Sequence, residues 1–264
     1  MNGTLPIFQI DAFTDRVFGG NPAAVCPLDE WLDDAVMQDA AAENNLSETA
    51  FFVPRDDGDF DIRWFTPRAE IDLAGHPTLA TAWLILNRLE TDRSSVRFHT
   101  KIGDVLEITG QDDLLEMDFP ARPPEPAQGV QDFAAALGDA PVEVLAARDG
   151  MAVFETEDQV RGLSPDMAKV AAFEYLGVIA TAPGRDCDFV SRFFAPRHGI
   201  PEDPVTGSAH CTLIPFWAER LGKDTLHARQ ISARGGELFC KNAGARVKIA
   251  GRAALYMEGV FRTS

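Results

Sequence analysis

The sequence has few basic residues and no long apolar run. Its 264 residues include 24 lysines and arginines against 41 aspartates and glutamates, which gives a formal net charge of −17. A surface of that charge repels phosphate backbones and anionic lipids, so we expect neither nucleic acid nor a membrane as a partner. The longest segments without an acidic or basic residue cover 15 positions each. A membrane-spanning helix takes about 20 apolar residues, and the sequence therefore predicts no such helix.

Cysteines and known catalytic motifs are also scarce. Four cysteines, Cys26, Cys187, Cys211 and Cys240, are scattered without a CxxC spacing, which indicates reduced and packed thiols. HExxH, GxSxG, GxGxxG and P-loop motifs are absent, and the five histidines lack a close metal-ligand spacing. We therefore expect no metal and no cofactor. Residues 1–12 lack the basic start and apolar core of a secretory signal, which predicts a cytoplasmic protein.

An internal repeat is present instead. The run Arg63–Arg68 (RWFTPR) is similar to Arg192–Arg197 (RFFAPR), 129 residues later. Each run ends an alternating, strand-like segment and is followed by one of the two uncharged segments, Leu73–Asn87 and Pro204–Ala218. Both uncharged segments begin like helices and are apolar on every side. A helix without a polar stripe must be covered all round, so we expect a curled sheet about each one.

The repeat predicts an α+β protein with two pseudo-symmetric halves, each a curled, mostly antiparallel sheet around a central buried helix. The proline-rich stretch 120–126 is the expected linker between an N-terminal half, 1–119, and a C-terminal half, 127–264. An acidic helix is expected over about Asp29–Asn44.

The amino ends of the two buried helices are candidate anion sites. Free backbone N–H groups and the positive end of the helix dipole favour a carboxylate, and Gly75, Gly207 and Ser208 allow a ligand to approach the backbone. Duplication predicts that both ends line a single cleft between the halves. The alternative interpretation is that these glycines only permit tight turns.

Two polar residues, His76 and Asp203, stand near these helix starts in apolar surroundings, and Glu48 is a third polar residue in an apolar segment. Glu48 begins an apolar strand, and burial would raise its pKa, so that the carboxyl group could take a proton from carbon and return it near neutral pH. Alternatively, Glu48 caps a backbone group or pairs with an arginine. His76 can equally be a turn residue, and Asp203, which precedes a proline, a turn former.

Several motifs in order resemble the PhzF-like isomerases of phenazine biosynthesis, which share the diaminopimelate epimerase fold. They run through nearly the whole chain: Ile10–Thr14 (IDAFT), Gly20–Val25 (GNPAAV), Asn45–Thr49 (NLSET), Phe65–Pro67 (FTP), Ala74–Thr78 (AGHPT) and Glu202–Ala209 (EDPVTGSA). The resemblance implies two similar halves, with the active site between them, and a homodimer. It also implies that the last strand, about 253–261, packs on the first half.

The resemblance also assigns roles. It implies that Glu48 shuttles a proton between substrate carbons, while His76 and Asp203 help to bind and polarise the substrate. The residues implied to line the same pocket are Ser47, Gly75, Gly207 and Ser208.

The chain differs from the cysteine-dependent epimerases and racemases of the same fold, in which two thiols flank the stereocentre. It has Ala74–Gly75 and Asp203 at those places, so we do not expect two-thiol racemisation. Cys211 is expected in the core. His210 stands where the phenazine enzyme is expected to have a small residue, and it would narrow the pocket.

Together these features predict a cofactor-free isomerase that moves a proton between carbons of a small carboxylated metabolite. The alternative hypothesis is a metabolite-binding or protein-interaction module that keeps the fold without catalysis, because fold similarity does not fix function.

Overall fold

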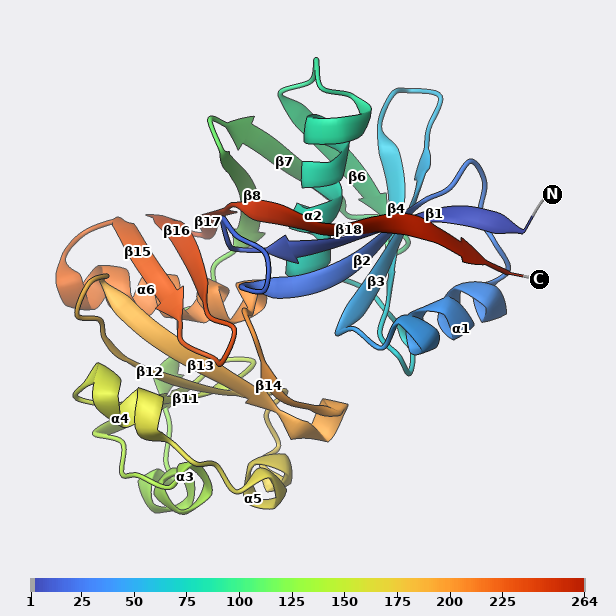
Figure 1. Ribbon diagram of the computed structural model, residues 1–264. Helices are drawn as coiled ribbons and strands as arrows, with labels where there is room; N and C mark the ends of the chain where they lie inside the picture. Colours follow the sequence, from blue (N-terminus) through green and yellow to red (C-terminus); the bar gives the residue numbers. More distant parts are fainter. Residues whose placement is uncertain (1–2, 264) are drawn as a thin grey trace. The chain divides into compact units, whose positions relative to one another are not determined.

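The computed structural model describes residues 3–263, and the chain divides into two compact units. Unit 1 comprises the residues up to Asp118 and those from Ala250 onward, and unit 2 comprises Phe119–Ile249 (Figure 1). Both units combine strands with helices, which confirms the predicted α+β class. Within residues 3–263 no helix has the length and apolar character that crossing a bilayer requires.

Unit 1 is a sheet with two helices and a short π-helical turn. Its strands are β1 (Thr4–Ala12), β2 (Asn21–Pro27), β3 (Glu48–Pro54), β4 (Phe60–Phe65), β5 (Glu70–Ile71), β6 (Ser95–Thr100), β7 (Val105–Gln111), β8 (Leu114–Pro120, which ends in unit 2) and β18 (Ala253–Arg262). Its helices are α1 (Asp34–Asn44), α2 (Gly75–Leu84) and the π-helical turn Ile85–Leu89. Most pairings are antiparallel, but β2 is parallel to β3 and β4 is parallel to β6.

Helix α2 is the buried helix that the apolar segment predicts. Eight of its ten residues are buried, from His76 to Leu84, because its small and aliphatic side chains offer no polar face. Helix α1 packs its buried residues Met37 and Ala41 in a cluster with Phe51 and Phe65 of the sheet. It begins at Asp34 rather than at the predicted Asp29, since the N–H of Leu28 still donates to the sheet at Phe52 (2.9 Å).

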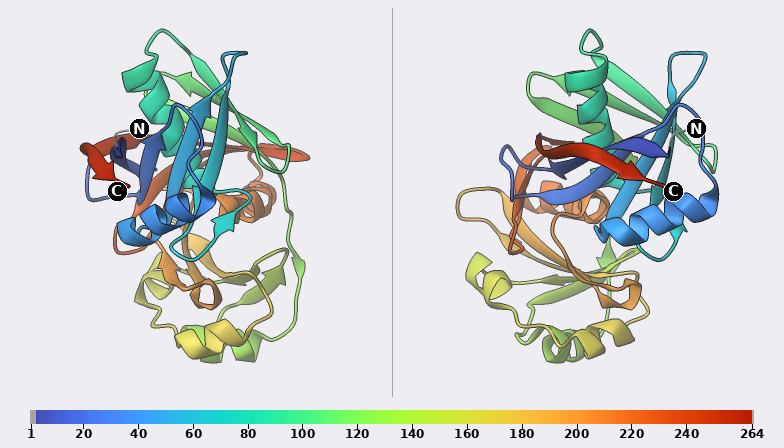
Figure 2. Two further views of the ribbon diagram at one scale, coloured as in Figure 1. Left: turned by 90° about the vertical axis from the view of Figure 1, so that its right-hand side faces the viewer. Right: turned by 45° about the vertical axis from the view of Figure 1, so that its right-hand side comes forward.

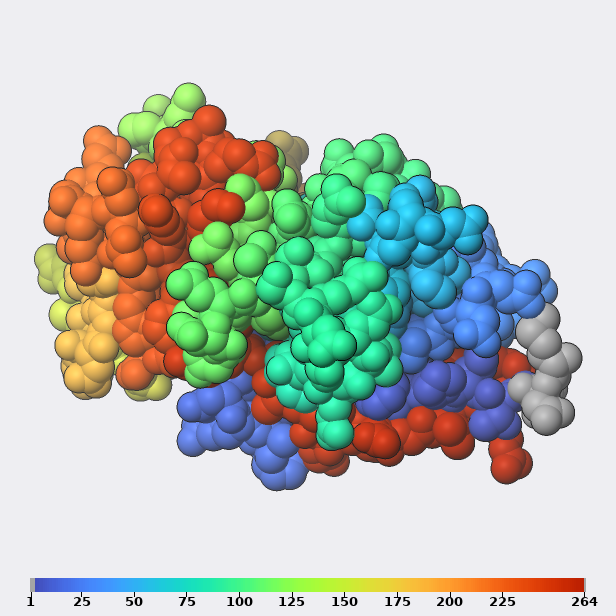
Figure 3. All heavy atoms as spheres, turned by 90° about the horizontal axis from the view of Figure 1, so that it is seen from above, coloured from blue at the N-terminus to red at the C-terminus, as the bar shows by residue number. Residues whose placement is uncertain are grey.

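Strand β18 brings the end of the chain into unit 1. It pairs antiparallel with β1 from Ala253↔Ala12 to Arg262↔Thr4, with a register shift between Gln9 and Ile10. All ribbon views show the red strand running beside the dark-blue one (Figures 1 and 2). The space-filling view shows red atoms at the surface next to the dark-blue ones (Figure 3).

Unit 2 is built in the same way, with extra helices. Its strands are β9 (Glu125–Pro126), β10 (Glu143–Ala146), β11 (Gly150–Val153), β12 (Val178–Pro183), β13 (Phe189–Ala195), β14 (Ile200–Asp203), β15 (Thr225–Gln230), β16 (Gly236–Ala243) and β17 (Arg246–Gly251, which ends in unit 1). Its helices are α3 (Val130–Leu137), α4 (Glu157–Gly162), α5 (Met167–Ala172), the 3₁₀ turn Pro196–His198 and α6 (Gly207–Leu221). Ten of the fifteen residues of α6 are buried, and the helix continues through Pro215.

The strand pairings repeat between the units, as the sequence repeat predicts. In unit 1 the parallel pair β2–β3 is followed by antiparallel β3–β4 and parallel β4–β6. In unit 2 the parallel pair β11–β12 is followed by antiparallel β12–β13 and parallel β13–β15. The two RxFxPR runs end the corresponding strands β4 and β13, and a buried helix follows each.

Candidate active site

Glu48 and His76 meet in unit 1. His76 Nε2 lies 3.3 Å from Glu48 Oε2, and both side chains are almost fully buried. Glu48 is the first residue of β3, and His76 is the second residue of α2. The structure therefore brings together two of the three residues to which the sequence assigns chemistry.

Strand β2 fixes the imidazole of His76. The ring forms a hydrogen bond to the backbone of Pro22, and Nε2 has no hydrogen-bond partner among residues 3–263, so the bond belongs to Nδ1. A backbone carbonyl only accepts, which places a proton on Nδ1. The parallel register of β2 and β3 sets Ala23 opposite Glu48, so Pro22 lies one position from the level of the carboxylate.

His76 is a neutral side chain at pH 7. Burial lowers the pKa of His76 to about 3, with the Pro22 hydrogen bond acting in the opposite direction. With a proton on Nδ1 and none on Nε2, the nitrogen that faces Glu48 is a hydrogen-bond acceptor. Glu48 can thus take up a proton on its carboxyl group and donate that O–H as a hydrogen bond to the neutral Nε2 of His76.

Asp203 is held in a polar cluster of unit 2, at the start of α6. It ends β14, and the hydroxyl of Thr206 donates a short hydrogen bond to its Oδ2. Gln230 completes the cluster, because its Nε2 donates to the Asp203 carbonyl (2.7 Å) and its Oε1 accepts from the Thr206 N–H (2.8 Å). Thr206 is the N-cap residue of α6, but its hydroxyl binds Asp203 instead of capping the helix.

The predicted binding residues lie at the starts of their elements. Gly75 and Gly207 are the first residues of α2 and α6, Ser208 follows in the first turn of α6, and Ser47 immediately precedes β3. Ser208 Oγ accepts a hydrogen bond from Arg148 Nη2 at 2.9 Å. The predicted sharing of one cleft by the two helix starts stays a prediction.

The four thiols are not poised for acid–base work. Burial raises the pKa of Cys187 and Cys211 to about 11, and it raises the pKa of Cys26 and Cys240 further still. A thiol with a raised pKa carries almost no thiolate at pH 7. The expectation that the chain does not use a pair of cysteines stays a prediction.

His210 is a core residue of unit 2. Its side chain is fully buried, its Nδ1 bonds the carbonyl oxygen of Thr206 at 2.8 Å, and its ring lies 5.8 Å from that of Phe189. Burial lowers the pKa of His210 to about 4, against the effect of the Thr206 hydrogen bond.

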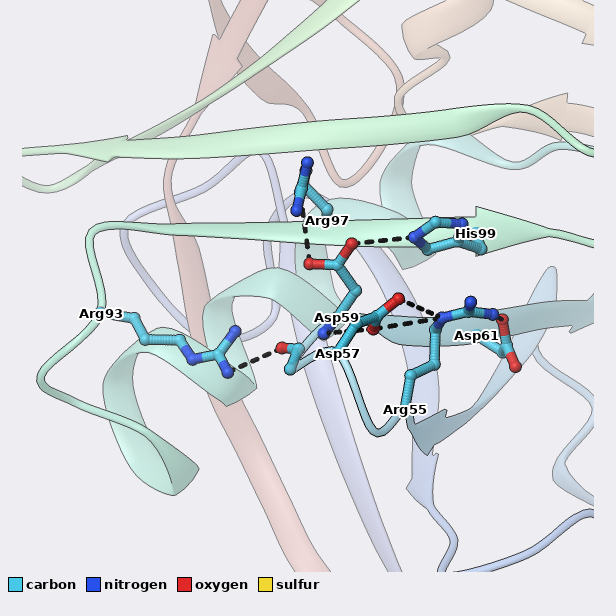
Figure 4. A network of polar contacts seen from close by, with 8 residues as sticks. Arg55, Asp57, Asp59, Asp61, Arg93, Arg97 and His99 are labelled. Atoms are coloured by element: carbon cyan, nitrogen blue, oxygen red, sulfur yellow. Dashed lines mark hydrogen bonds and ion pairs between the residues drawn. The ribbon is translucent and has the colours of Figure 1, made fainter.

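One group of side chains in residues 3–263 has the spacing of metal ligands: Asp57, Asp59 and His99 of unit 1. Each carboxylate in it already has a cationic or hydrogen-bonding partner (Figure 4). Asp59 accepts from Arg97 Nε (3.2 Å) and lies 2.8 Å from His99 Nε2, while Arg55 bonds Asp57. The pKa of Asp59 is lowered, mainly by the His99 hydrogen bond. The cluster is explained as an ion-pair network between the β3–β4 connection and β6.

Because His76 and His210 are buried, we expect the protein to lose stability in weak acid. Their pKa values are lower in the folded protein than in the unfolded chain, so the unfolded chain alone gains these protons as pH falls below about 6.5. Above about pH 6.5 neither state binds these protons, and the free energy of unfolding does not depend on the two histidines. Below that pH, each histidine lowers the free energy of unfolding by about 1.4 kcal/mol per pH unit. Urea unfolding between pH 7 and pH 5 measures this slope.

A matched pair of variants assigns the slope. H210Q removes one of the buried imidazoles and should reduce the slope by the contribution of one proton, about 1.4 kcal/mol per pH unit. H198Q changes an exposed histidine and should leave the slope unchanged. Equal slopes in the wild type and H210Q would contradict the prediction.

The architecture places the protein in the class of epimerase-like folds. A hydroxyproline epimerase from Agrobacterium vitis superposes with a TM-score of 0.61 at 11% identity, over 99% of this chain and 94% of that one. At that identity the likeness concerns the fold alone.

Closer comparisons define the family. The sequence profile described as phenazine biosynthesis-like protein (PhzC–PhzF) matches residues 10–259, and this chain belongs to that family. An uncharacterized isomerase of Pseudomonas aeruginosa is 52% identical over 97% of this chain and 98% of its own length. A human phenazine biosynthesis-like domain-containing protein is 38% identical, with coverage of 97% and 98%. The crystal structure of a PhzF-family protein from Enterococcus faecalis has a TM-score of 0.95 and 44% identity, over 98% of this chain and 99% of that one.

Sequence reasoning left three contributors without a role. Pro22 belongs to the GNPAAV motif, but nothing local shows that its carbonyl orients His76. Gln230 and Arg148 lie 24 and 60 residues from their partners Thr206 and Ser208, and no spacing rule connects them.

Proposed function

We propose that this protein is an isomerase that moves a proton between carbons of a small carboxylated metabolite, with Glu48 as the acid–base group. The observation that supports it best is the buried Glu48 carboxyl group 3.3 Å from the neutral, proton-accepting Nε2 of His76. The family relatives named as isomerases agree with this reaction class.

The proposed reaction conserves atoms and electrons. The Glu48 carboxylate takes a proton from one carbon, and the electron pair of the broken C–H bond moves into the adjoining unsaturated system of the substrate. The protonated carboxyl group then returns a proton to a second carbon, and the double bond shifts. His76 Nε2 can accept the carboxyl O–H between the two steps, which keeps the proton in place.

Substrate binding is assigned to the polar groups at the helix starts. Backbone N–H groups at Gly75 and Gly207 would bind the substrate carboxylate, as free N–H groups at helix N-termini do. Ser47, Ser208 and Asp203 complete the proposed set. No step in this scheme requires a cofactor or a metal, because a side chain supplies and receives the proton. A homodimer and a cytoplasmic location stay predictions.

The test is a binding screen followed by product analysis. Small mono- and dicarboxylic acids, saturated and unsaturated, are screened by thermal shift, and those that stabilise the protein are incubated with it in D₂O and followed by NMR. We expect at least one acid to give an isomer, which carries deuterium at the accepting carbon where the Glu48 proton exchanges with solvent before it is returned. Acids that stabilise the protein but stay chemically unchanged and unlabelled would favour a binding module instead.

A further inference from the structure

A charged side chain of unit 2 contacts one of the proposed binding residues. Arg148 lies in the turn between β10 and β11, where the Ala147 N–H donates to the Asp149 carbonyl (3.0 Å). Its Nη2 reaches the first turn of α6 and donates to Ser208 Oγ at 2.9 Å. Sixty residues separate the two partners, so the contact depends on the fold of unit 2.

A buried carboxylate holds the guanidinium in place. Asp149 is 0% exposed, and its Oδ2 accepts from Arg148 Nη2 (2.8 Å) and from Nε (3.2 Å). Burial raises the pKa of Asp149, and the charges of Arg148 and Arg122 oppose that shift. Arg148 itself is 30% exposed at its side chain, so one edge of the guanidinium is buried against Asp149 while the group still reaches the surface.

The direction of the Arg148–Ser208 bond is fixed by chemistry. A guanidinium has donors only, so Ser208 Oγ is the acceptor and the hydroxyl hydrogen must point away from Arg148. Arg148 is the partner that the structure gives Ser208 Oγ, and Ser208 is half-buried rather than fully solvated. A hydroxyl that accepts from a cation is also polarised into a stronger donor.

We propose that Arg148 is a positioning residue, held by Asp149, that sets the Ser208 hydroxyl as a hydrogen-bond donor toward an oxygen of the substrate. This inference rests on the proposed function and makes it more specific, because it requires that the group bound at Ser208 be an acceptor, such as a carboxylate or carbonyl oxygen, and not an ammonium group.

A double-mutant cycle tests the coupling. R148M, S208A and the double variant are compared with the wild type for KM and kcat on the acid that the screen identifies. We expect R148M and S208A each to raise KM about 10-fold, the loss of one charge-assisted hydrogen bond, with kcat changed much less. In the S208A background R148M should have no further effect on KM, because its only route to the substrate is through Ser208.

Controls separate positioning from stability. R220M removes another arginine of unit 2, the partner of Glu143, and should leave KM unchanged. R148K keeps a cation and should restore part of the affinity. The midpoint of thermal unfolding of each variant reports any loss of stability separately from KM, and R148M loses its hydrogen bond to Ser208 only in the wild-type background.

The outcomes distinguish this inference from the proposed function. If R148M raises KM as much in S208A as in the wild type, or has no effect in either, the positioning role is wrong while the isomerase proposal stands. If the wild type converts no acid, the proposed function fails and the inference fails with it.

Discussion

Replacing Glu48 with glutamine should lower kcat at least about 100-fold and leave the protein folded and able to bind acids. Glutamine preserves the size of the side chain, and its amide can still lie beside His76 Nε2, but it neither accepts a proton from carbon nor returns one. Positioned acid–base groups contribute roughly 10²- to 10⁴-fold to rates. Initial rates by NMR, together with ligand-induced thermal shifts, measure the two halves of this prediction.

The matched control is Glu43→Gln, which makes the same chemical change at an exposed position of helix α1. It should have wild-type kcat and KM. A Glu48→Gln variant that turns over at the wild-type rate would remove Glu48 from the mechanism, whatever its effect on binding. Loss of folding in the variant would be visible by circular dichroism and would be answered with Glu48→Asp, which keeps the acid but moves it back by one methylene group.

Gly20→Ala should destabilise unit 1 by about 3 kcal/mol, because two penalties add at this position. Gly20 has φ +59°, in the left-handed region that favours glycine, and a Cβ atom there would lie 2.1 Å from the backbone oxygen of Ala12. Backbone cannot give way as a flexible side chain does. The free energy of unfolding in urea measures the loss.

Gly58→Ala is the control for the backbone penalty alone. Gly58 also has a positive φ, +85°, but the nearest atom to an added Cβ is the end of the Arg93 side chain at 3.5 Å, an ordinary contact. Gly58→Ala should lower the free energy of unfolding by only about 1 kcal/mol. Equal losses in the two variants would contradict the steric argument.

The Gly20 position also connects the fold to the site. Asn21 and Pro22 follow directly, and the Pro22 backbone is the hydrogen-bond partner of His76. A Gly20→Ala protein that remains folded should therefore lose activity in addition to stability.

Local sequence features account for much of the fold. The apolar segments Leu73–Asn87 and Pro204–Ala218 lack a polar stripe, and each contains a helix that is buried almost throughout. The RxFxPR repeat marks strands β4 and β13, which occupy equivalent positions in the pairing pattern of the two units. Local composition did not predict the start of α1 correctly. The N–H of Leu28 donates a hydrogen bond to Phe52 of the sheet, and that partner lies 24 positions away in the sequence.

The sequence by itself determined the fold class, the duplication and the candidate residues Glu48, His76 and Asp203, since periodicity, charge and motif order are properties of neighbouring residues. Only the tertiary structure decided the positions and the hydrogen-bond partners of these residues. The register of β2 with β3 brings Pro22 near the level of Glu48, and the fold of unit 2 brings Arg148 to Ser208 and Gln230 to Asp203. Such contacts join residues that are far apart in the chain, and their geometry follows from strand register and core packing, which no local pattern encodes.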